Sequence, residues 1–214
     1  IALLGALAVP QHRMAQILLY AVPVLIAQPQ VAHGGHIAAL GGGPVELHGP
    51  GLVLGHAVAG EQQIHLGMHL LGRIVDGLLQ PLDGKPLPLQ GEAISLFPQP
   101  LNPLLRQPIT QPLDVGIRAI NGILTAGKGQ RLGLFAGSGV GKSMLLGMMT
   151  RNTQAQIVIV GLIGERGREV REFIDHSLGA DGLAKAIVVA APADQSPLLR
   201  LRAAELCHRM AGYF

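Results

Sequence analysis

The feature that most constrains the fold of this chain of 214 residues is a glycine-rich turn that joins a short apolar run to a helical pattern. The apolar run covers residues 131–136, the turn covers 137–141, and the helical pattern covers 142–152. A short apolar run that is bounded by a turn predicts a buried strand. The sequence therefore predicts strand, loop and helix in immediate succession.

The turn has the residue types of a phosphate-binding loop, with the letters AGSGVGKS at positions 136–143. Polyphosphate oxygens must be met by several backbone N–H groups at once, and glycines let the backbone curl closely around them. The helix that begins near Lys142 adds the positive end of its dipole. The predicted nucleotide-binding residues are Gly137, Ser138, Gly139, Val140, Gly141, Lys142 and Ser143.

Three positions of this loop have more specific expectations. We expect Lys142 to reach the β- and γ-phosphates of ATP and Ser143 to place its hydroxyl group on a Mg²⁺ ion. The general pattern has glycine where this chain has Ala136. Because alanine resists positive φ, the loop must keep a negative φ there or end the strand at that residue.

The chain beyond the loop alternates strand and helix patterns. Apolar, β-branched runs predict buried strands at 156–163 and 186–191, and an amphipathic pattern predicts a helix at 169–178. Ser196 followed by Pro197 is typical of a helix start. The repeated strand–helix order predicts an α/β fold with a parallel sheet.

A second group of functional candidates follows the strand at 156–163. Glu165 leaves that strand at the edge of the sheet where ligands bind in parallel α/β folds. A carboxylate there could polarise a water for attack on the γ-phosphate, and Arg166 could hold phosphate or tie Glu165 in place. Physical reasoning alone leaves the alternative open that these are a solvated loop and a helix start.

Residues 1–69 differ in kind from the rest. They contain three charged side chains and seven of the nine histidines, whereas residues 70–214 contain 15 Lys/Arg and 11 Asp/Glu. The histidine intervals are irregular, which disfavours a zinc site. Three interpretations stay open for this segment: poorly ordered chain, metal binding, or a wrong-frame translation joined to a genuine sequence.

The remaining organisation is a Pro-rich connector at 70–113, followed by the partial ATP-binding domain at 114–214. Eight prolines between 81 and 112 forbid long helices in the connector. The apolar stretch at 15–27 contains Pro23 and is shorter than the ~20 residues of a membrane-spanning helix, so we expect no membrane span. The first residue, Ile1, and a last residue within a helical pattern favour a fragment.

The motifs resemble a known family. GSGVGKS at 137–143 together with GLIGERGREV at 161–170 resembles the rotary and secretion ATPase superfamily, in which the Gly-Glu-Arg element carries a catalytic glutamate. The sequence is more similar still to the flagellar protein-export (type III secretion) ATPase, for which Ala136 is usual. That resemblance rests on LGRIVDG at 71–77, PLDG at 81–84, DVGIRAIN at 114–121, GQRLGLFAGSGVGKSMLLGMM at 129–149 and AAPADQSPLLRL at 190–201.

The resemblance implies a RecA-like P-loop core that binds ATP and Mg²⁺, with Glu165, Lys142 and Arg166 as catalytic residues. It implies a homo-hexamer that is cytoplasmic and peripheral to the inner membrane. Partners would be the export gate, stalk and regulator proteins, chaperones and export substrates, with no nucleic acid. The family's β-barrel is not recognisable in residues 1–69. The Walker B strand and the arginine finger are not recognisable either, so we expect weak nucleotide binding at most and no turnover by this chain.

Three alternatives stay open at this stage. The parent could be an F-type or V-type rotary ATPase catalytic subunit. It could be a RecA-like RNA helicase or termination factor, which would need aromatic and basic RNA-binding residues that 1–69 scarcely offers. It could also be a non-catalytic interaction fragment that retains its phosphate-binding loop as a relic.

Overall fold

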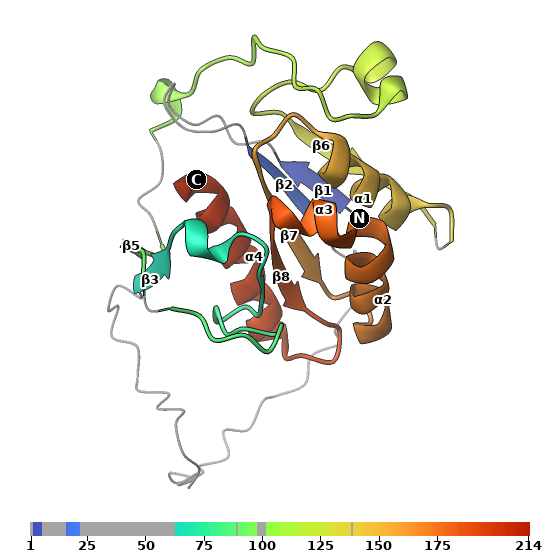
Figure 1. Cartoon of the computed structure of the whole chain (residues 1–214). Coiled ribbons are helices and arrows are strands. Elements are labelled where there is room, and N and C mark those ends of the chain that lie inside the picture. The colour runs from blue at the N-terminus through green and yellow to red at the C-terminus, as the bar shows by residue number, and fades with distance from the viewer. Residues whose placement is uncertain (1, 6–15, 22–62, 89, 98–101, 138) are drawn as a thin grey trace, which may run out of the picture. The chain divides into compact units, whose positions relative to one another are not determined.

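The computed structural model describes residues 2–5, 16–21, 63–88, 90–97, 102–137 and 139–214 (Figure 1). A six-stranded sheet has the order β4-β8-β7-β2-β1-β6. The first four strands in this order run parallel to one another, and β1 is antiparallel to both of its neighbours. The strands are β1 (Ala2–Gly5), β2 (Gln16–Ala21), β4 (Ile74–Val75), β6 (Arg131–Leu134), β7 (Ile157–Ile163) and β8 (Ala186–Ala191).

Strands β7 and β8 are buried along their whole length because helices cover both of their faces. Side chains of successive strand residues point to opposite faces. Val158, Val160 and Leu162 therefore join one hydrophobic cluster, while Ile157, Ile159 and Ile163 join another. This double burial explains why both strands are continuous apolar runs in the sequence.

The first face is covered by the helix after the phosphate-binding loop and by the segment between β7 and β8. Helix α1 (Lys142–Asn152) contributes Leu146 and Met149 to this cluster. The segment consists of α2 (Gly167–Glu172), the π-helix η4 (Phe173–Leu178) and α3 (Gly179–Ala184). At Gly147 an added Cβ would lie 2.3 Å from the Ser177 carbonyl oxygen. The backbones of α1 and η4 are therefore in direct contact at this glycine.

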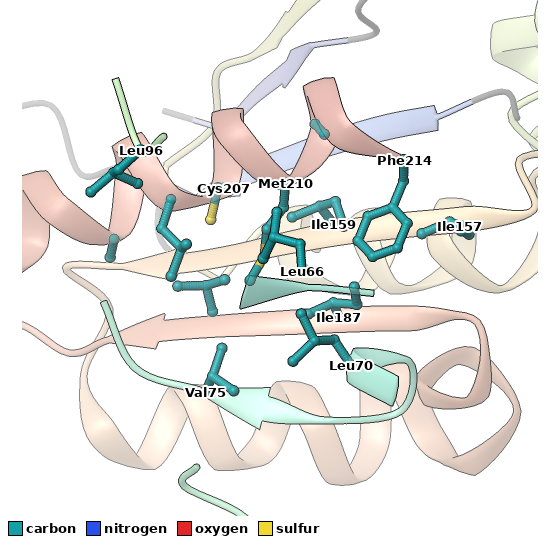
Figure 2. Packing of buried hydrophobic residues seen from close by; sticks show 14 of the residues in the cluster. Leu66, Leu70, Val75, Leu96, Ile157, Ile159, Ile187, Cys207, Met210 and Phe214 are labelled. Atoms are coloured by element: carbon teal, nitrogen blue, oxygen red, sulfur yellow. The ribbon is translucent and has the colours of Figure 1, made fainter. Parts of the chain in front are cut away.

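The second face is covered by α4 (Pro197–Tyr213), as Figure 2 shows for Cys207 and Met210, and by Phe214 directly after this helix. The chain between residues 63 and 97 packs into the same cluster through Leu66, Leu70 and other apolar side chains. This chain contains the small antiparallel pair of β3 (Gln63–Leu66) and β5 (Glu92–Ser95) and the short 3-10 helix η1 (Met68–Leu70).

The structure confirms several elements expected from the sequence. The helix at 142–152 and the strand at 186–191 have the predicted bounds, and the strand expected at 156–163 begins one residue later. The Ser196 side chain caps α4 by accepting a hydrogen bond of 3.3 Å from the Leu199 N–H. The RecA-like α/β class is therefore correct for this part of the chain.

Other expectations need correction. The helix expected at 169–178 begins at Gly167 and changes to a π-helix at Phe173. The sequence predicts a buried strand for β6, but this strand ends the described sheet and its residues alternate between exposed and half-buried. Met144 and Met148, two apolar residues of the helical pattern at 142–152, are 55% and 38% exposed because α1 packs through Leu146 and Met149 instead.

The sequence interpretation also misses the strands that residues 1–69 and the Pro-rich connector form. It predicts irregular or disordered chain for residues 1–69, yet β1, β2 and β3 all come from this range. The Pro-rich connector supplies β4, which pairs with β8, and Val75 is fully buried. Strand pairing depends on backbone hydrogen bonds, which leave little trace in the side-chain pattern of such short segments. Residues 1, 6–15 and 22–62 lie outside the described residues.

The DVGIRAIN motif connects the segment before β6 to the end of α1 through hydrogen bonds. The Asp114 carboxylate accepts hydrogen bonds from the Gly116 N–H at 2.7 Å and from the Asn121 side chain at 2.6 Å. The Asp114 carbonyl oxygen accepts from the Thr153 hydroxyl group at 2.9 Å. Gly116 has a φ of 73°, and an added Cβ would lie 2.3 Å from Asn152. The π-helix η3 (Ile120–Leu124) follows within this segment.

A bidentate ion pair organises the segment around β4, and it generates the first prediction. Arg73 donates to Asp83 from Nε at 2.6 Å and from Nη2 at 2.9 Å, and each side chain is 11% exposed. The hydrogen bonds from Arg73 hold the pKa of Asp83 well below its usual range. A lowered carboxyl pKa stabilises the folded state above the ordinary pKa of aspartate, and this contribution disappears as the pH falls.

We expect Asp83→Asn to lower the free energy of unfolding by about 1.5–3 kcal/mol near neutral pH, because the buried guanidinium loses a charged acceptor. The difference from wild type should shrink as the pH drops below the ordinary aspartate range. Urea unfolding at several pH values measures both effects. Asp175→Asn, which breaks the exposed pair with Arg171, is the matched control and should change stability by less than about 0.5 kcal/mol. Equal effects of the two substitutions would contradict the prediction.

Candidate nucleotide-binding site

Backbone hydrogen bonds beyond the ends of β7 and β8 hold Glu165 at the edge of the sheet. The Gly164 N–H donates to the Ala191 carbonyl oxygen at 2.8 Å, and the Ala193 N–H donates to the Glu165 carbonyl oxygen at 2.9 Å. These bonds extend the contact between the two chain segments past their strands. The backbone of Glu165 is therefore fixed at the carboxyl ends of two parallel strands, where ligands of open α/β sheets bind.

The glycines of the phosphate-binding loop fall into two classes. Gly139 and Gly141 have φ of 76° and 93°, values that side-chain-bearing residues rarely adopt. Gly137 does not have a left-handed φ, and an added Cβ there would meet nothing within 4 Å. The fold thus explains glycine at 139 and 141, whereas at 137 the close approach of a ligand would explain it. Ser138 lies outside the described residues.

The start of α1 is open to an anion. Gly141 is its N-cap, and among the described residues no side chain caps this end of the helix. The Leu145 N–H bonds the Gly141 carbonyl oxygen at 2.9 Å, which closes the first turn. The N–H groups before it and the positive end of the helix dipole are suited to phosphate. Val140, with 67% of its surface exposed, projects from the same loop.

Lys142 and Glu165 meet in this site, although they are 23 residues apart in the sequence. The Nζ atom of Lys142 lies 3.5 Å from Oε1 of Glu165, and the side chains are 20% and 19% exposed. The pair joins the first residue of α1 to a residue just beyond the end of β7. The two predicted catalytic groups therefore neutralise each other in this structure.

Burial governs the electrostatics of Glu165. Loss of solvent contact raises the pKa of Glu165, Lys142 lowers it, and the neighbouring carboxyl group of Glu169 raises it again. The net direction is upward. Glu165 is therefore a stronger base than an ordinary glutamate, which is the property that a water-activating carboxylate needs.

Arg166 does not tie Glu165 in place in this structure, and its contact with phosphate stays a prediction. Its Nη1 atom is 3.5 Å from Oε1 of Glu169, and its side chain is 71% exposed. It pairs with the next carboxylate of the helix rather than with Glu165. Sequence reasoning does not single out Glu169 as the partner of Arg166. Their spacing of three residues is the signal that could have revealed this pair.

The residues fit a magnesium ion that is held mainly by nucleotide. Ser143 lies in the first turn of α1, beside the open loop. No group of three or more His, Cys, Asp or Glu suited to a metal occurs in the part of the chain that the structure describes. Mg²⁺ is commonly bound through one or two protein oxygens together with phosphates and waters, so a single hydroxyl group at this place is consistent with it. Ala136, as expected, does not adopt a positive φ.

The comparison with protein families agrees with this geometry. Residues 116–214 match the nucleotide-binding domain of the ATP synthase alpha/beta family. The match covers 99 of the 214 residues. The matched range contains the phosphate-binding loop, Glu165 and Glu169.

Curated proteins that are similar to this chain include flagellum-specific ATP synthases and a type 3 secretion system ATPase. It is 60% identical over 152 residues to the flagellum-specific ATP synthase of Pseudomonas aeruginosa, a match that covers 71% of this chain and 34% of the relative. It is 56% identical over 167 residues to that of Salmonella typhimurium, covering 78% and 35%. The type 3 secretion system ATPase of Xanthomonas euvesicatoria is 46% identical over 151 residues. The chain spans about a third of the length of these relatives.

Solved structures of family members have the same fold. A prototypical ATPase of the type III secretion system of pathogenic bacteria has a TM-score of 0.67 and 46% identity, covering 71% of this chain and 44% of its own. The assembled ATPase EscN in complex with its central stalk EscO has a TM-score of 0.66 at the same identity, covering 71% and 38%. In the described part of this chain, no helix has the length and apolar character needed to cross a membrane.

The raised pKa of Glu165 generates the second prediction. A carboxyl group whose pKa rises on folding stabilises the folded state at low pH, and this contribution is lost as the pH rises through the folded pKa. We expect Glu165→Gln to be more stable than wild type near neutral pH and to lose this advantage near pH 4. Thermal unfolding without nucleotide at both pH values measures the difference. Glu172→Gln, on the exposed side of α2, is the control, and a loss of stability in Glu165→Gln at neutral pH would refute the interpretation.

Proposed function

We propose that this chain is the nucleotide-binding part of an ATPase that energises flagellar or type III protein export. The single observation that carries the proposal is the Lys142–Glu165 pair beside an uncapped helix start and two left-handed glycines. Three features needed for hydrolysis of a triphosphate lie together there: a phosphate cradle, a cation and a buried base. The family relatives supply the biological setting.

Each residue has a distinct role in this proposal. The N–H groups of residues 137–143 and the ammonium group of Lys142 bind the phosphates, and Ser143 provides an oxygen for Mg²⁺. Bound Mg²⁺ would neutralise phosphate charge. Glu165 orients the attacking water and accepts its proton. Arg166, which is exposed and paired with Glu169, acts on the position of that residue.

Nucleotide binding would rearrange the charges of the site. In this structure the ammonium group of Lys142 lies next to the carboxylate of Glu165. A triphosphate offers more negative charge, so Lys142 turns to the phosphates and releases Glu165. When a γ-phosphate is present, Glu165 is therefore no longer next to Lys142, whose positive charge lowers the proton affinity of its carboxylate. Base strength is thereby coupled to occupancy of the loop.

The finer features of the parent protein follow from its relatives. We infer a homo-hexamer at the cytoplasmic face of the inner membrane, with the export gate, stalk and regulator proteins, chaperones and export substrates as partners. One of the similar solved structures is an assembled ATPase in complex with its central stalk, which supports an assembly of this kind. We also propose that the chain divides into the segments 1–69, 70–113 and 114–214.

The third prediction tests phosphate binding. Lys142→Ala should weaken Mg-ATP binding by about 10–100-fold, since a charge-assisted hydrogen bond contributes roughly 1.5–3 kcal/mol. Gly137→Ala should weaken binding by at least about tenfold while the melting temperature stays within about 2 °C of wild type, because the fold has room for the methyl group. Titration of fluorescent ATP measures the affinities. Lys128→Ala, at an exposed lysine outside the loop, is the control.

Two outcomes would overturn the proposal. The first is wild-type affinity for Mg-ATP in both loop variants. The second is robust steady-state hydrolysis by this chain that persists in Glu165→Gln, since the proposal makes Glu165 the base. For the chain by itself we expect weak binding and no turnover, because a neighbouring arginine finger can contribute ~10³–10⁵ in rate.

A further inference from the structure

Two buried polar atoms at the junction between β8 and α4 have no hydrogen-bond partner in the part of the chain that the structure describes. They are the side-chain oxygen Oε1 of Gln195 and the Nε atom of Arg200. Every other buried side-chain nitrogen or oxygen of the described residues has a partner. Since buried polar atoms in folded proteins are nearly always paired, this unpaired acceptor and this unpaired donor need an explanation.

The start of α4 brings the two side chains to neighbouring positions. Ser196 is the N-cap of this helix, so Gln195 directly precedes the cap and Arg200 lies four positions after it. The Arg200 N–H donates to the Ser196 carbonyl oxygen at 3.2 Å, which closes the first turn. Side chains at these two positions of a helix start commonly pack against each other. The unpaired acceptor and the unpaired donor therefore belong to one local site.

The turn before α4 is joined to the proposed base by a backbone hydrogen bond. The Ala193 N–H donates to the Glu165 carbonyl oxygen at 2.9 Å. The Gln195 N–H donates to the Pro192 carbonyl oxygen at 3.1 Å, which fixes Gln195 within the turn. Because β7 and β8 are parallel, Glu165 and this turn both lie at the carboxyl ends of their strands. Gln195 therefore lies at the edge of the sheet where ligands bind in such folds.

The packing of the fold gives no reason for these two polar atoms. A buried polar atom without a hydrogen bond destabilises the folded state, because the atom gives up its bonds to water. The hydroxyl group of Ser196 in the same junction is satisfied, since it accepts from the Leu199 N–H at 3.3 Å. A ligand that supplies one donor and one acceptor would satisfy Gln195 and Arg200 in the same way.

We propose that Gln195 orients the attacking water and that Arg200 donates a hydrogen bond to the γ-phosphoryl group. An acceptor next to a donor is complementary to a water molecule next to a phosphoryl oxygen, and these are the two reactants of triphosphate hydrolysis. A water O–H group donates to Oε1 of Gln195, and a phosphoryl oxygen accepts from Nε of Arg200. This inference rests on the proposed function and adds a second wall to the same site.

The two residues act on different parts of the reaction. The water oxygen forms a bond to the γ-phosphorus, and the bond from that phosphorus to the β–γ bridging oxygen breaks with its electron pair on ADP. One water proton passes to Glu165. The other proton stays on the oxygen that joins phosphorus, and Gln195 accepts its hydrogen bond, which aims a lone pair of the water at phosphorus. Arg200 stabilises the negative charge of the phosphoryl oxygens.

The fourth prediction concerns the stability of the chain without nucleotide. Gln195→Met and Arg200→Met each replace a buried unpaired atom by an apolar one, so neither should destabilise the fold. Thermal unfolding should give a melting temperature that is within about 2 °C of wild type or higher. Ser196→Ala, which removes a satisfied cap, is the comparison and should lower the melting temperature. Losses in both methionine variants as large as in Ser196→Ala would show that the two atoms have structural partners and would contradict the inference.

The role of Arg200 is tested in this chain through the third phosphate. Arg200→Met should weaken the binding of a non-hydrolysable ATP analogue with Mg²⁺ by about tenfold or more, because a charge-assisted hydrogen bond is lost. The affinity for Mg-ADP, which has no γ-phosphate, should change by less than about twofold. Arg171→Met, at an arginine whose side chain is 85% exposed, is the control and should change neither affinity. Equal weakening for both nucleotides, or no weakening for either, would overturn this role.

The role of Gln195 is tested through turnover in a hydrolysing protein that contains this chain. Gln195→Met should lower kcat by about tenfold or more and change KM by less than about threefold, since the hydrogen bond to the attacking water contributes to the chemical step. Gln156→Met, at an exposed glutamine just before the opposite end of β7, is the control and should leave both constants unchanged. An unchanged kcat in Gln195→Met would refute its role. Failure of wild type to bind Mg-ATP would instead contradict the proposed function.

Discussion

The parallel pairing of β7 with β8 is the constraint on which the rest of this structure depends. Both strands are buried on both faces, so their side chains must satisfy two hydrophobic clusters at once. The pairing also brings their carboxyl ends to one edge. There the bonds from Gly164 to Ala191 and from Ala193 to Glu165 continue the contact beyond the strands. The position of the proposed base is thus a direct consequence of core packing.

The site built on this edge holds a balance of charges that a nucleotide would change. Burial makes ionised Glu165 unfavourable, and Lys142 compensates for part of this effect. A phosphate that draws Lys142 away leaves a more basic carboxylate in place. In the proposed function, Lys142 and Glu165 thereby connect the binding of phosphate to the activation of water.

The glycines are of two kinds: at some positions the packing of the fold requires glycine, and at another only a bound ligand would require it. At Gly147 and Gly116 an added methyl group would meet backbone or side-chain atoms at 2.3 Å, so packing alone demands glycine there. At Gly137 it would meet open space. In the proposed function, glycine at this position, beside an uncapped helix start, allows the close approach of a phosphate. This difference separates substitutions that test stability from substitutions that test binding.

The sequence by itself determined the phosphate-binding loop, helix α1, strand β8, the start of α4 and the placing of Glu165 near the loop. These depend on local patterns: glycine spacing, continuous apolar runs and the Ser196-Pro197 cap. Only the tertiary structure decided the pairing of β4 with β8, the strands in residues 1–69, the exposure of Met144 and Met148, and the contact of Arg166 with Glu169 rather than Glu165. The physical reason is that these features arise from backbone pairing and from which helix face meets a neighbour, and neither is encoded within a short stretch of chain.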